Sequence, residues 1–478
     1  MSVSVARKIA FDALLRVESE SAYASELLHA ALTPEVKPAD AALATELTLG
    51  VLRWRRSLDF LLERQLKKPL AKLDLPVALA LRIGLYQLRF LEKIPARAAV
   101  NESVELVKRA RQSSAAALVN AVLRRAARDA KGPLEKLVPH DLPVAERLGV
   151  LLSHPTWLVE RWLARFGEPA TAALLEANNR APRMTFALGD PAHRESIVEE
   201  LESGGLRIER GRLLENAFAA SGGSLARTRA FQRGDISIQD EASQAVPRLL
   251  GVRPGDRVLD VCSAPGGKTA ALARAATPRG LVIAGELHEH RLRSMREHLQ
   301  RLRIATRQFQ EEITPGQATE MFRTGSPRVQ LVALDASQPL PFSAQFDRIL
   351  VDAPCSGTGT LARHPEIRWR LRPEQLEEFH FLQVKLLRNA LAQLAPGGRL
   401  VYSTCSMEPE ENESVVAEAL RSGEFRLVPA AESARLLAPH LAPGMESSSL
   451  FDAGGFFRAS PAVHGTDGFF AAVLDNSR

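Results

Sequence analysis

The sequence predicts a multidomain protein with an all-helical domain, a small α/β module and an open α/β domain built on a mostly parallel sheet. Residues 1–130 carry apolar residues at three- and four-residue spacing, which is typical of amphipathic helices. From about Arg257, short β-rich runs alternate with helical segments, which indicates a parallel sheet with helices on both faces. A chain of 478 residues is long enough for two or three such domains.

The helical domain is expected to span residues 1–140. The apolar spacing is clearest in residues 41–66 and 75–94 and predicts helices there. Another helix is expected to begin at Asn101, because Glu102 and Glu105 would then lie in its first turns. The segment after it should be a helix that stops at Gly132-Pro133. Helices joined by such short loops fit a bundle.

Two further domains are expected after the bundle. Residues 141–232 indicate a proline-rich linker, a helix at 155–167 and a small α/β module. The large α/β domain is expected over residues 233–478, and ligands of such a sheet bind at the carboxyl ends of its strands. Its strands are expected at 257–262, 281–287, 329–335, 346–352, 398–405 and 468–474, with helices at 268–276 and 288–303.

The composition is that of a folded soluble protein, with 45% hydrophobic and 25% charged residues. The apolar runs are far shorter than a membrane span, and the first residues lack the apolar core of a secretion signal. Three cysteines, an odd number, do not favour a disulfide framework. We therefore expect a cytoplasmic protein with reduced thiols and no membrane association.

The net charge of +6 is concentrated at the beginning of the chain. Residues 1–150 hold 24 basic against 17 acidic residues, whereas the remainder holds 38 against 39. A local basic surplus favours a polyanionic partner such as nucleic acid. Charge alone fits a well-solvated helical surface equally well or better.

Residues 258–272, VLDVCSAPGGKTAAL, predict a strand, a Gly-rich turn and the start of a helix. The turn lets the backbone pass close to a ligand, and the helix N–H groups attract polar or negative groups. A phosphate-binding loop would need glycine in place of Cys262, and the dinucleotide pattern G-x-G-x-x-G is absent. The next strand ends at Glu286, near the offset of an acid that binds ribose hydroxyls. The turn suits an adenosine-type cofactor, and a tight turn without a ligand is the alternative.

Two more acids, Asp335 and Asp352, stand at predicted strand ends. Aspartate at such a position is commonly only a turn or cap residue. Here three acids and a Gly-rich turn converge on one edge of the predicted sheet, which favours a functional site.

All three cysteines also lie at the carboxyl ends of predicted strands. One cysteine in such a place is usually a small buried hydrophobe, but all three at the ligand edge favour chemistry over packing. A zinc site is the competing hypothesis; the chain lacks a C-x-x-C pair, and His364 is not at ligand spacing to any of them. The candidates for thiol nucleophiles are Cys262, Cys355 and Cys405.

A thiolate beside an adenosine-type cofactor has a specific chemical use. Its addition to C6 of a cytosine makes the neighbouring C5 nucleophilic enough to take a methyl group from a sulfonium. The site must then supply an acid near the pyrimidine and a group that assists release. An unperturbed thiol has a pKa of about 8.5, so cationic neighbours such as Lys268 or Arg363 are expected to favour the thiolate. The target base must be exposed or flipped out of its stack.

These motifs resemble the bacterial 16S ribosomal RNA cytosine-C5 methyltransferase B family (RsmB/Sun/Fmu type). The resemblance covers nearly the whole chain. It is carried by the Gly-rich loop LDVCSAPGGKT, the Pro-Cys motif VDAPCSGTGTLARHPEIRW, the Thr-Cys motif YSTCSMEPEENE and the segment GDISIQDEASQ. Residues 153–162 and 175–184 are similar to its intermediate module, and residues 100–125 to its NusB-like RNA-binding domain.

The resemblance implies a Rossmann-like domain that uses S-adenosylmethionine (SAM) to methylate a cytosine, expected to be cytosine 967 of 16S rRNA. Cys405 would be the nucleophile and Cys355 would assist release; strand position alone treats the two alike. Asp352 would lie near the methionine end and the target base, with Lys268 beside it. No metal is implied, and a monomer is expected. The implied cofactor-binding residues are Cys262, Ser263, Ala264, Pro265, Gly266, Gly267, Lys268, Glu286, Asp335 and Asp352.

The chain departs from the family pattern in four places. Ser263 replaces a common alanine, and Glu286 replaces the usual aspartate. The stretch 304–330 is longer than expected, and TDGFF at 466–470 replaces Gly-Asp-Gly-Phe-Phe. Three alternatives remain: methylation of another RNA, a non-catalytic RNA-binding or antitermination factor, and a DNA cytosine methyltransferase. The last is expected to attack with its Pro-Cys thiol.

Overall fold

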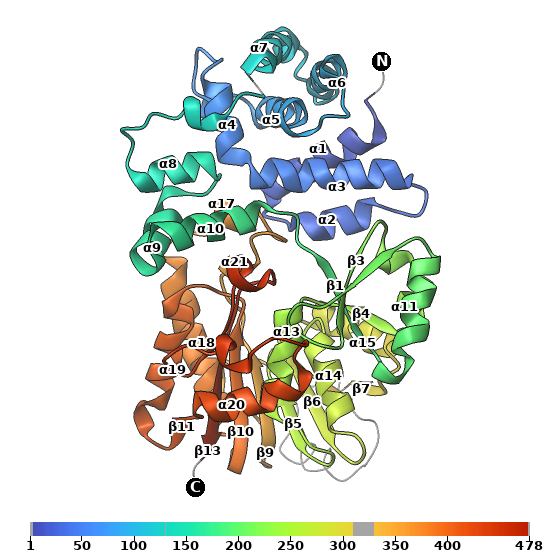
Figure 1. Cartoon of the computed structure of the whole chain (residues 1–478), viewed down its shortest axis with the longest axis vertical. Coiled ribbons are helices and arrows are strands. Elements are labelled where there is room, and N and C mark those ends of the chain that lie inside the picture. Colours follow the sequence, from blue (N-terminus) through green and yellow to red (C-terminus); the bar gives the residue numbers. More distant parts are fainter. Residues whose placement is uncertain (1–2, 130, 309–328, 477–478) are drawn as a thin grey trace. The chain divides into compact units, whose positions relative to one another are not determined.

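The computed structural model describes residues 3–129, 131–308 and 329–476, and they form two compact units. One unit comprises residues 1–181 and 360–371, and the other comprises 182–359 and 372–478. In the described part of the chain, no helix is long and apolar enough to cross a membrane. The expected helical domain, small module and α/β domain are all present (Figure 1).

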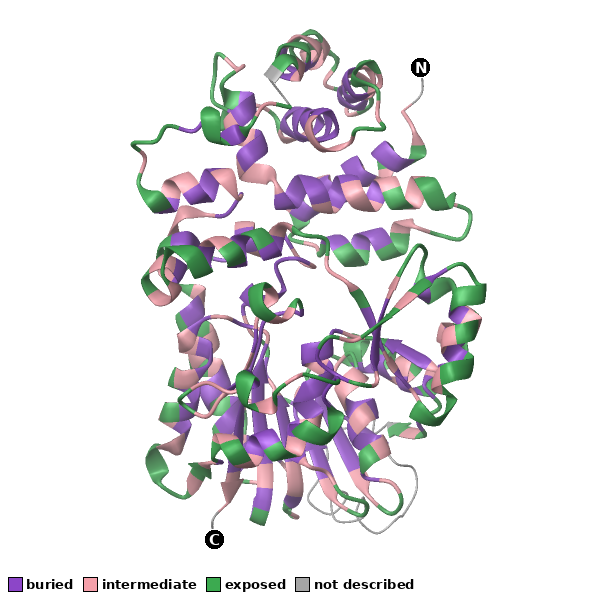
Figure 2. Cartoon of the chain, viewed as in Figure 1, coloured by how far each residue is buried: buried purple, intermediate pink, exposed green. Residues whose placement is uncertain are grey.

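The first unit is helical throughout and has its own apolar core. Helix α5 lies at its centre, and Figure 2 shows it buried along nearly its whole length. Pro95 precedes α6, which therefore begins five residues before Asn101, so the expected helix start at Asn101 is wrong. The helices are α1 (Val5–Glu20), α2 (Ala24–Ala31), α3 (Pro38–Arg53), α4 (Arg55–Glu63), α5 (Leu75–Phe90), α6 (Ala96–Arg109), α7 (Ala116–Asp129), α8 (Val144–Leu151), α9 (Thr156–Phe166) and α10 (Glu168–Asn179).

Residues 360–371, which include the second half of the Pro-Cys motif, also belong to the helical unit. This segment contains α17 (Ile367–Arg370), and the guanidinium of Arg368 is fully buried. That guanidinium donates to the backbone oxygens of Ser153 and Asn178 at 3.1 Å each and to Asn179 Oδ1 at 2.8 Å. Burial lowers the pKa of Arg368 to about 9. A buried charge bound by so many backbone oxygens fixes the 360–371 segment within this unit.

The second unit begins with the small α/β module. Its four strands form an antiparallel sheet in the order β2-β3-β1-β4, and Phe186, Phe218 and Ile236 lie in its core. The elements are β1 (Met184–Leu188), α11 (Arg194–Ser203), β2 (Arg207–Arg210), β3 (Ala217–Ser221), α12 (Arg229–Gln232) and β4 (Ile236–Ile238).

The large sheet follows the strand order β11-β13-β10-β9-β5-β6-β8-β7. In the lower half of Figure 1 its labelled strands run from β11 at the left to β7 at the right. The strands from β10 to β7 are parallel, while β13 runs antiparallel to β10. The strands are β5 (Arg257–Asp260), β6 (Leu281–Glu286), β7 (Thr306–Gln308), β8 (Val329–Ala333), β9 (Phe346–Asp352), β10 (Leu394–Thr404), β11 (Phe425–Leu427), β12 (Phe457–Ala459) and β13 (Phe469–Asn476).

Helices cover both faces of this sheet, as the sequence predicts. Consecutive strand residues point to opposite faces, so Val258 joins the core under α14 and α15 while Leu259 joins the core under α18 and α19. The helices are α13 (Glu241–Ala245), α14 (Gly267–Ala275), α15 (Glu289–Arg301), α18 (Gln375–Leu391), α19 (Glu413–Ala419), α20 (Ala430–Leu437) and α21 (Pro461–His464). Most of the long 304–330 stretch lies outside the described residues; its ends form β7 and the start of β8.

Candidate active site

Two of the three thiols meet at the carboxyl ends of neighbouring strands. Strands β9 and β10 pair in parallel with Ser403 opposite Asp352, so the loops after them leave the same edge of the sheet. Cys355 and Cys405 lie on these loops, and their Sγ atoms are 3.3 Å apart. The juxtaposition predicted from strand ends is therefore present for this pair.

Backbone contacts hold the two cysteine loops together. Gly359 N donates to Cys405 O at 2.9 Å, and Gly468 N donates to Gly359 O at 2.7 Å. A Cβ on Gly359 would lie 2.2 Å from Gly468 O, so the close approach requires glycine there. The TDGFF segment, which departs from the family pattern, thus reaches the cysteine loops through Gly468.

A lysine–aspartate pair lies at the end of β9. Lys268 Nζ is 2.7 Å from Asp352 Oδ2, and Ser403 Oγ donates to Asp352 Oδ1 at 2.7 Å. The ammonium also lies 5.1 Å from the centroid of the Phe469 ring. Asp352 is thus a hydrogen-bonded carboxylate held between strands β9 and β10 and helix α14. The pair can orient a polar ligand and hold a proton near it.

The Gly-rich turn connects β5 to α14 and is fixed by short hydrogen bonds. Ser263 N and Oγ both donate to Gly285 O, at 2.9 and 2.8 Å. Gly266 has a φ of +101°, which favours glycine, and α14 begins at the next residue. The turn residues Cys262 to Lys268, together with Asp260 and Asp352, line a cavity of about 120 Å³.

Asp260 is a buried acid at this cavity that the sequence analysis passed over. Thr269 Oγ1 donates to its Oδ2 at 2.6 Å, while its buried Oδ1 has no protein partner. Burial raises the pKa of Asp260 to about 7. An acid at the end of β5 could have been identified in the quoted VLDVC motif, because the aspartate stands at the end of an apolar run.

The raised pKa of Asp260 predicts a pH-dependent stability. In the folded state this carboxyl keeps its proton up to about pH 7, whereas in the unfolded chain it loses it near its ordinary value of 3.8. The folded state therefore binds more protons within this window, so the Asp260 contribution to stability falls as the pH rises from about 4 to 7. Asp260→Asn should gain stability relative to the wild type over that range, by a few kcal/mol at most. Urea unfolding at several pH values measures the difference; a constant difference would contradict the assignment.

Glu286 and Asp335 lie at neighbouring strand ends but do not line the 120 Å³ cavity. Leu334 N donates to Glu286 O, which places the two strand ends side by side. The buried Glu286 carboxylate accepts from His288 N at 3.1 Å and lies 3.2 Å from Arg291 Nη1. Asp335 is exposed, and its Oδ1 accepts from Ser337 N and Oγ. Asp335 thus has the contacts of a turn residue, and no ligand role follows from its geometry alone.

The remaining predicted thiol and cations differ in their surroundings. Burial raises the pKa of Cys262 strongly, so this thiol remains protonated at neutral pH. Lys268 approaches Asp352, whereas Arg363 and His364 belong to the segment that clusters with the helical unit. Among the described residues, no group of three or more His, Cys, Asp or Glu side chains could hold a metal ion.

Cys355 has a raised pKa for a different reason from Cys262. The hydrogen bond with Cys405 is the largest cause, and burial is the second. Cys355 therefore holds its proton at neutral pH and can donate it toward the sulfur of Cys405. The proximity of Cys405 thus raises the pKa of Cys355, which strand position alone does not reveal.

The segment that leads into the α/β domain also lines the cavity. Gln239 and Ser243 come from it, and His298 reaches the same cavity from α15. Burial lowers the pKa of His298 to about 4, so this imidazole is neutral. Gln239 and Ser243 lie in the motif GDISIQDEASQ, and neither is among the site residues predicted from the sequence.

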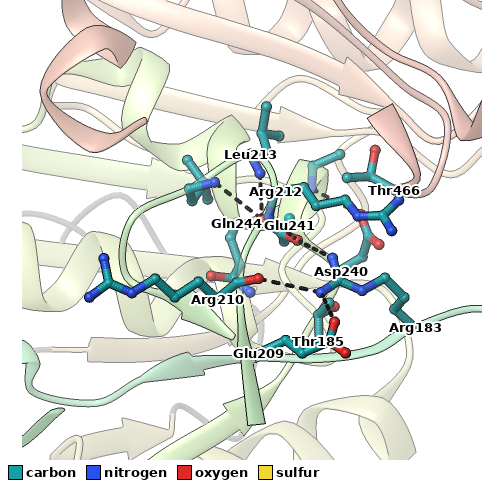
Figure 3. A network of polar contacts seen from close by, with 12 residues as sticks. Arg183, Thr185, Glu209, Arg210, Arg212, Leu213, Asp240, Glu241, Gln244 and Thr466 are labelled. Atoms are coloured by element: carbon teal, nitrogen blue, oxygen red, sulfur yellow. Dashed lines mark hydrogen bonds and ion pairs between the residues drawn. The ribbon is translucent and has the colours of Figure 1, made fainter. Parts of the chain in front are cut away.

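A buried glutamate anchors this segment to the small module (Figure 3). Glu241 is 1% exposed, and its carboxylate accepts from Arg212 N, Leu213 N and Leu214 N at 2.8–3.1 Å. Arg183 Nη1 lies 3.7 Å from the same carboxylate. These contacts hold the start of α13, and with it the backbone that carries Gln239 and Ser243.

A second cavity of this unit is not at the thiols. It has a volume of about 500 Å³ and lies between α14 and the small module, lined by groups such as Arg248, Arg274 and His440. Of the predicted site residues, only Gly267 lines it. The candidate catalytic and cofactor-binding residues therefore lie at the cysteine loops and the Gly-rich turn, not at this larger cavity.

The parallel sheet, the Gly-rich turn and the acidic strand ends define the class of the chain, an α/β methyltransferase. Residues 247–475 match the family described as 16S rRNA methyltransferase RsmB/F. Residues 4–128 match the NusB family, and residues 154–221 match the ferredoxin-like domain of RsmF/B-like methyltransferases.

The chain belongs to the ribosomal RNA small subunit methyltransferase B family. It is 33% identical to the probable ribosomal RNA small subunit methyltransferase B of Bacillus subtilis, over 99% of both chains. It is 32% identical to ribosomal RNA small subunit methyltransferase B of Erwinia tasmaniensis, over 98% of both chains. The crystal structure titled PH0851 has the same fold, with a TM-score of 0.76, 24% identity and complete coverage of both chains. These matches confirm the family and the methyltransferase fold expected from the motifs.

Proposed function

We propose that the protein transfers a methyl group from SAM to C5 of a cytosine in 16S rRNA, namely cytosine 967, through a covalent bond between Cys405 and C6. The observation that carries the proposal is the 3.3 Å contact between the two thiols beside the Lys268–Asp352 pair. Family membership supports the substrate class and the cofactor. An RNA-binding factor without catalytic activity would not need two thiols in contact at the ligand edge of the sheet.

The residues at the Gly-rich turn fit SAM. At Gly266 the turn brings the backbone close to the ligand edge of the sheet. The buried Oδ1 of Asp260 has no hydrogen-bond partner in the protein and could accept a hydrogen bond from a ligand. Residues 262–268 would hold the cofactor, and the buried carboxylate of Glu286 would accept hydrogen bonds from the ribose hydroxyls. Asp335 would lie near the adenine. When bound, SAM supplies an electrophilic methyl group on a sulfonium.

The protein's own groups account for the steps at the pyrimidine. Cys405 Sγ, as the thiolate, forms a bond to C6, and the electron pair of the C5–C6 double bond moves into the ring. The Lys268–Asp352 pair would donate a proton toward the pyrimidine N3 and so stabilise the added charge. C5 would then form its bond to the methyl group, while the bond from that methyl group to the sulfonium sulfur breaks and leaves its electron pair on the sulfur.

Release falls to Cys355. While Cys405 is free, its hydrogen bond is the main reason that Cys355 keeps its proton. Once the Cys405 sulfur is bound to C6, the largest cause of the raised pKa is lost, so Cys355 would release its proton to solvent more readily and act as a base. It then removes the proton at C5, the C6–S bond breaks, and the electron pair returns to Cys405. This order assigns different roles to two thiols in contact.

The helical unit supplies a basic surface for the RNA. Helices α6 and α7 carry exposed cations, and Arg111, Arg124 and Arg128 lie on this part of the surface. The sequence match to the NusB family covers the same helices. Phosphate contacts of this kind would hold the RNA without reading its sequence.

Reversing two of these charges should weaken RNA binding. We expect Arg124→Glu with Arg128→Glu to raise the Kd for rRNA by roughly tenfold and to reduce its salt slope by about two. The matched control is Arg421→Glu with Arg435→Glu, two exposed arginines of the other unit. Filter binding across a salt series measures both. Equal affinities for the two double variants would contradict an RNA surface on α7.

Bisulfite sequencing of 16S rRNA from a deletion strain tests the function as a whole. In the deletion strain we expect one cytosine to lose its protection from bisulfite conversion, and the wild-type chain should restore that protection. The position of this cytosine decides between cytosine 967 and another nucleotide. Tritium transfer from labelled SAM to rRNA provides the direct assay. No transfer by the wild-type protein to naked rRNA or to the assembling small subunit would contradict the proposal.

A further inference from the structure

A fully buried glutamate joins the loops that carry the two thiols. Glu411 is 0% exposed, and its Oε1 accepts from Ser356 N at 2.8 Å. Its Oε2 accepts from the hydroxyls of Ser356 and Ser406. These two serines directly follow Cys355 and Cys405, so one carboxylate binds the residue next to each thiol.

Further hydrogen bonds fix the position of this carboxylate. Gln383 Nε2, on α18, donates to Glu411 Oε1 at 3.1 Å and to Pro354 O at 2.9 Å. Tyr402 OH, on β10, donates to the backbone oxygen of Glu411 at 2.6 Å. The glutamate is therefore held from α18 and from β10, the strand that leads to Cys405.

The two serine hydroxyls also contact one another. Ser356 Oγ lies 3.1 Å from Ser406 Oγ, and Thr358 Oγ1 lies 3.3 Å from the same hydroxyl. Thr358 Oγ1 also accepts from Met407 N at 2.8 Å. A buried network of hydrogen bonds with Glu411 at its centre thus joins the two cysteine loops, and each member restrains the others.

We propose that Glu411 is a positioning residue, which holds the Pro-Cys loop against the Thr-Cys loop and thereby sets the contact between Cys355 and Cys405. The inference rests on the proposed function, because the contact matters through the roles of the two thiols. Glu411 does not touch the reacting atoms in this account. It acts through Ser356 and Ser406.

A carboxylate suits this position better than an amide. Four donors point at its two oxygens, and both oxygens accept. A glutamine has one acceptor oxygen, and its NH₂ group would face some of these four donors. At least one buried donor would therefore lose its hydrogen-bond partner. Burial raises the pKa of Glu411, and the hydrogen bonds from the two serines oppose that rise.

Two variants distinguish the effect of the Glu411 charge from the effect of the serine contacts that hold the loops. Glu411→Gln removes the charge and an acceptor, whereas the double change Ser356→Ala with Ser406→Ala keeps the charge and removes the hydroxyl contacts. Glu418→Gln is the matched control, because this carboxylate on α19 pairs with His380 and Arg388. Thermal unfolding checks that each variant folds; if Glu411→Gln does not, the serine variant decides.

Oxidation by diamide measures the proximity of the thiols without substrate. The two thiols form one S–S bond and release two protons and two electrons, and diamide takes both up to become the hydrazine. Mass spectrometry of peptides follows the Cys355–Cys405 disulfide. In both variants we expect this rate to fall by roughly tenfold or more, and kcat for methyl transfer to fall by about 10- to 100-fold. The KM for SAM should stay within about twofold.

The outcomes are distinct. A fall of cross-linking rate and kcat in both variants, with wild-type values for Glu418→Gln, supports the positioning role. Wild-type rates in both variants would overturn it. A fall in Glu411→Gln alone would overturn the role of the two hydroxyls, because the serine variant keeps both the charge and the bond from Ser356 N to Glu411. If the wild-type protein transfers no methyl group, the proposed function fails, while the cross-linking rates still decide the position of the loops.

Discussion

Replacing Cys405 with serine is expected to abolish methyl transfer to rRNA, with a loss of at least about 10³-fold. A serine hydroxyl stays protonated at neutral pH and is a far weaker nucleophile, so the bond to C6 does not form. Tritium release from C5-labelled cytosine and methyl incorporation from labelled SAM both measure the loss.

Binding measurements on the same variant provide the control. Serine is close to cysteine in size, and Cys405 is only partly buried, so the fold and the affinity for rRNA should be retained. Methyl transfer by Cys405→Ser within tenfold of the wild type would exclude Cys405 as the nucleophile.

Replacing Cys355 with serine should have a different result, the accumulation of a covalent protein–RNA complex. Cys405 can still add to C6 and C5 can still be methylated, but the base that removes the C5 proton is missing. The adduct should survive a denaturing gel and should require both SAM and RNA. Cys355→Ser thus separates bond formation from release, which the loss of activity alone cannot do.

The double variant with both cysteines replaced is the control for this experiment. It should form no adduct, since the attacking sulfur is absent. An adduct in Cys405→Ser, and none in Cys355→Ser, would reverse the two roles.

Much of the fold could be predicted because its signals are local. The strands of the large sheet are short apolar runs followed by acids or cysteines, and each of the six predicted strands is present. The start of α6 was misplaced because Asn101 and two glutamates suggested a helix start, whereas Pro95 determines where the helix begins. The contacts of Arg368 with Ser153 and Asn179 join segments about 200 residues apart, and apolar spacing gives no signal for them.

The site was predictable in its parts but not in its arrangement. Strand ends place both thiols at the ligand edge, but their contact, and the rise that it causes in the pKa of Cys355, have no signal in the sequence. Asp260 and Glu411 were within quoted motifs and passed over, because a carboxylate in a sequence does not reveal that it is buried. Arg363, a candidate cationic neighbour of the thiolate, clusters with the helical unit, and the sequence gives no signal for that division.

Mass spectrometry of the trapped complex tests the central claim most directly. The complex formed by Cys355→Ser with 16S rRNA and SAM is digested with nuclease and protease, and the peptide that carries the nucleotide is identified. We expect a methylated cytosine bound to the peptide that contains the loop after β10, through the sulfur of Cys405. A nucleotide on any other residue, or an adduct that forms without Cys405, would contradict it.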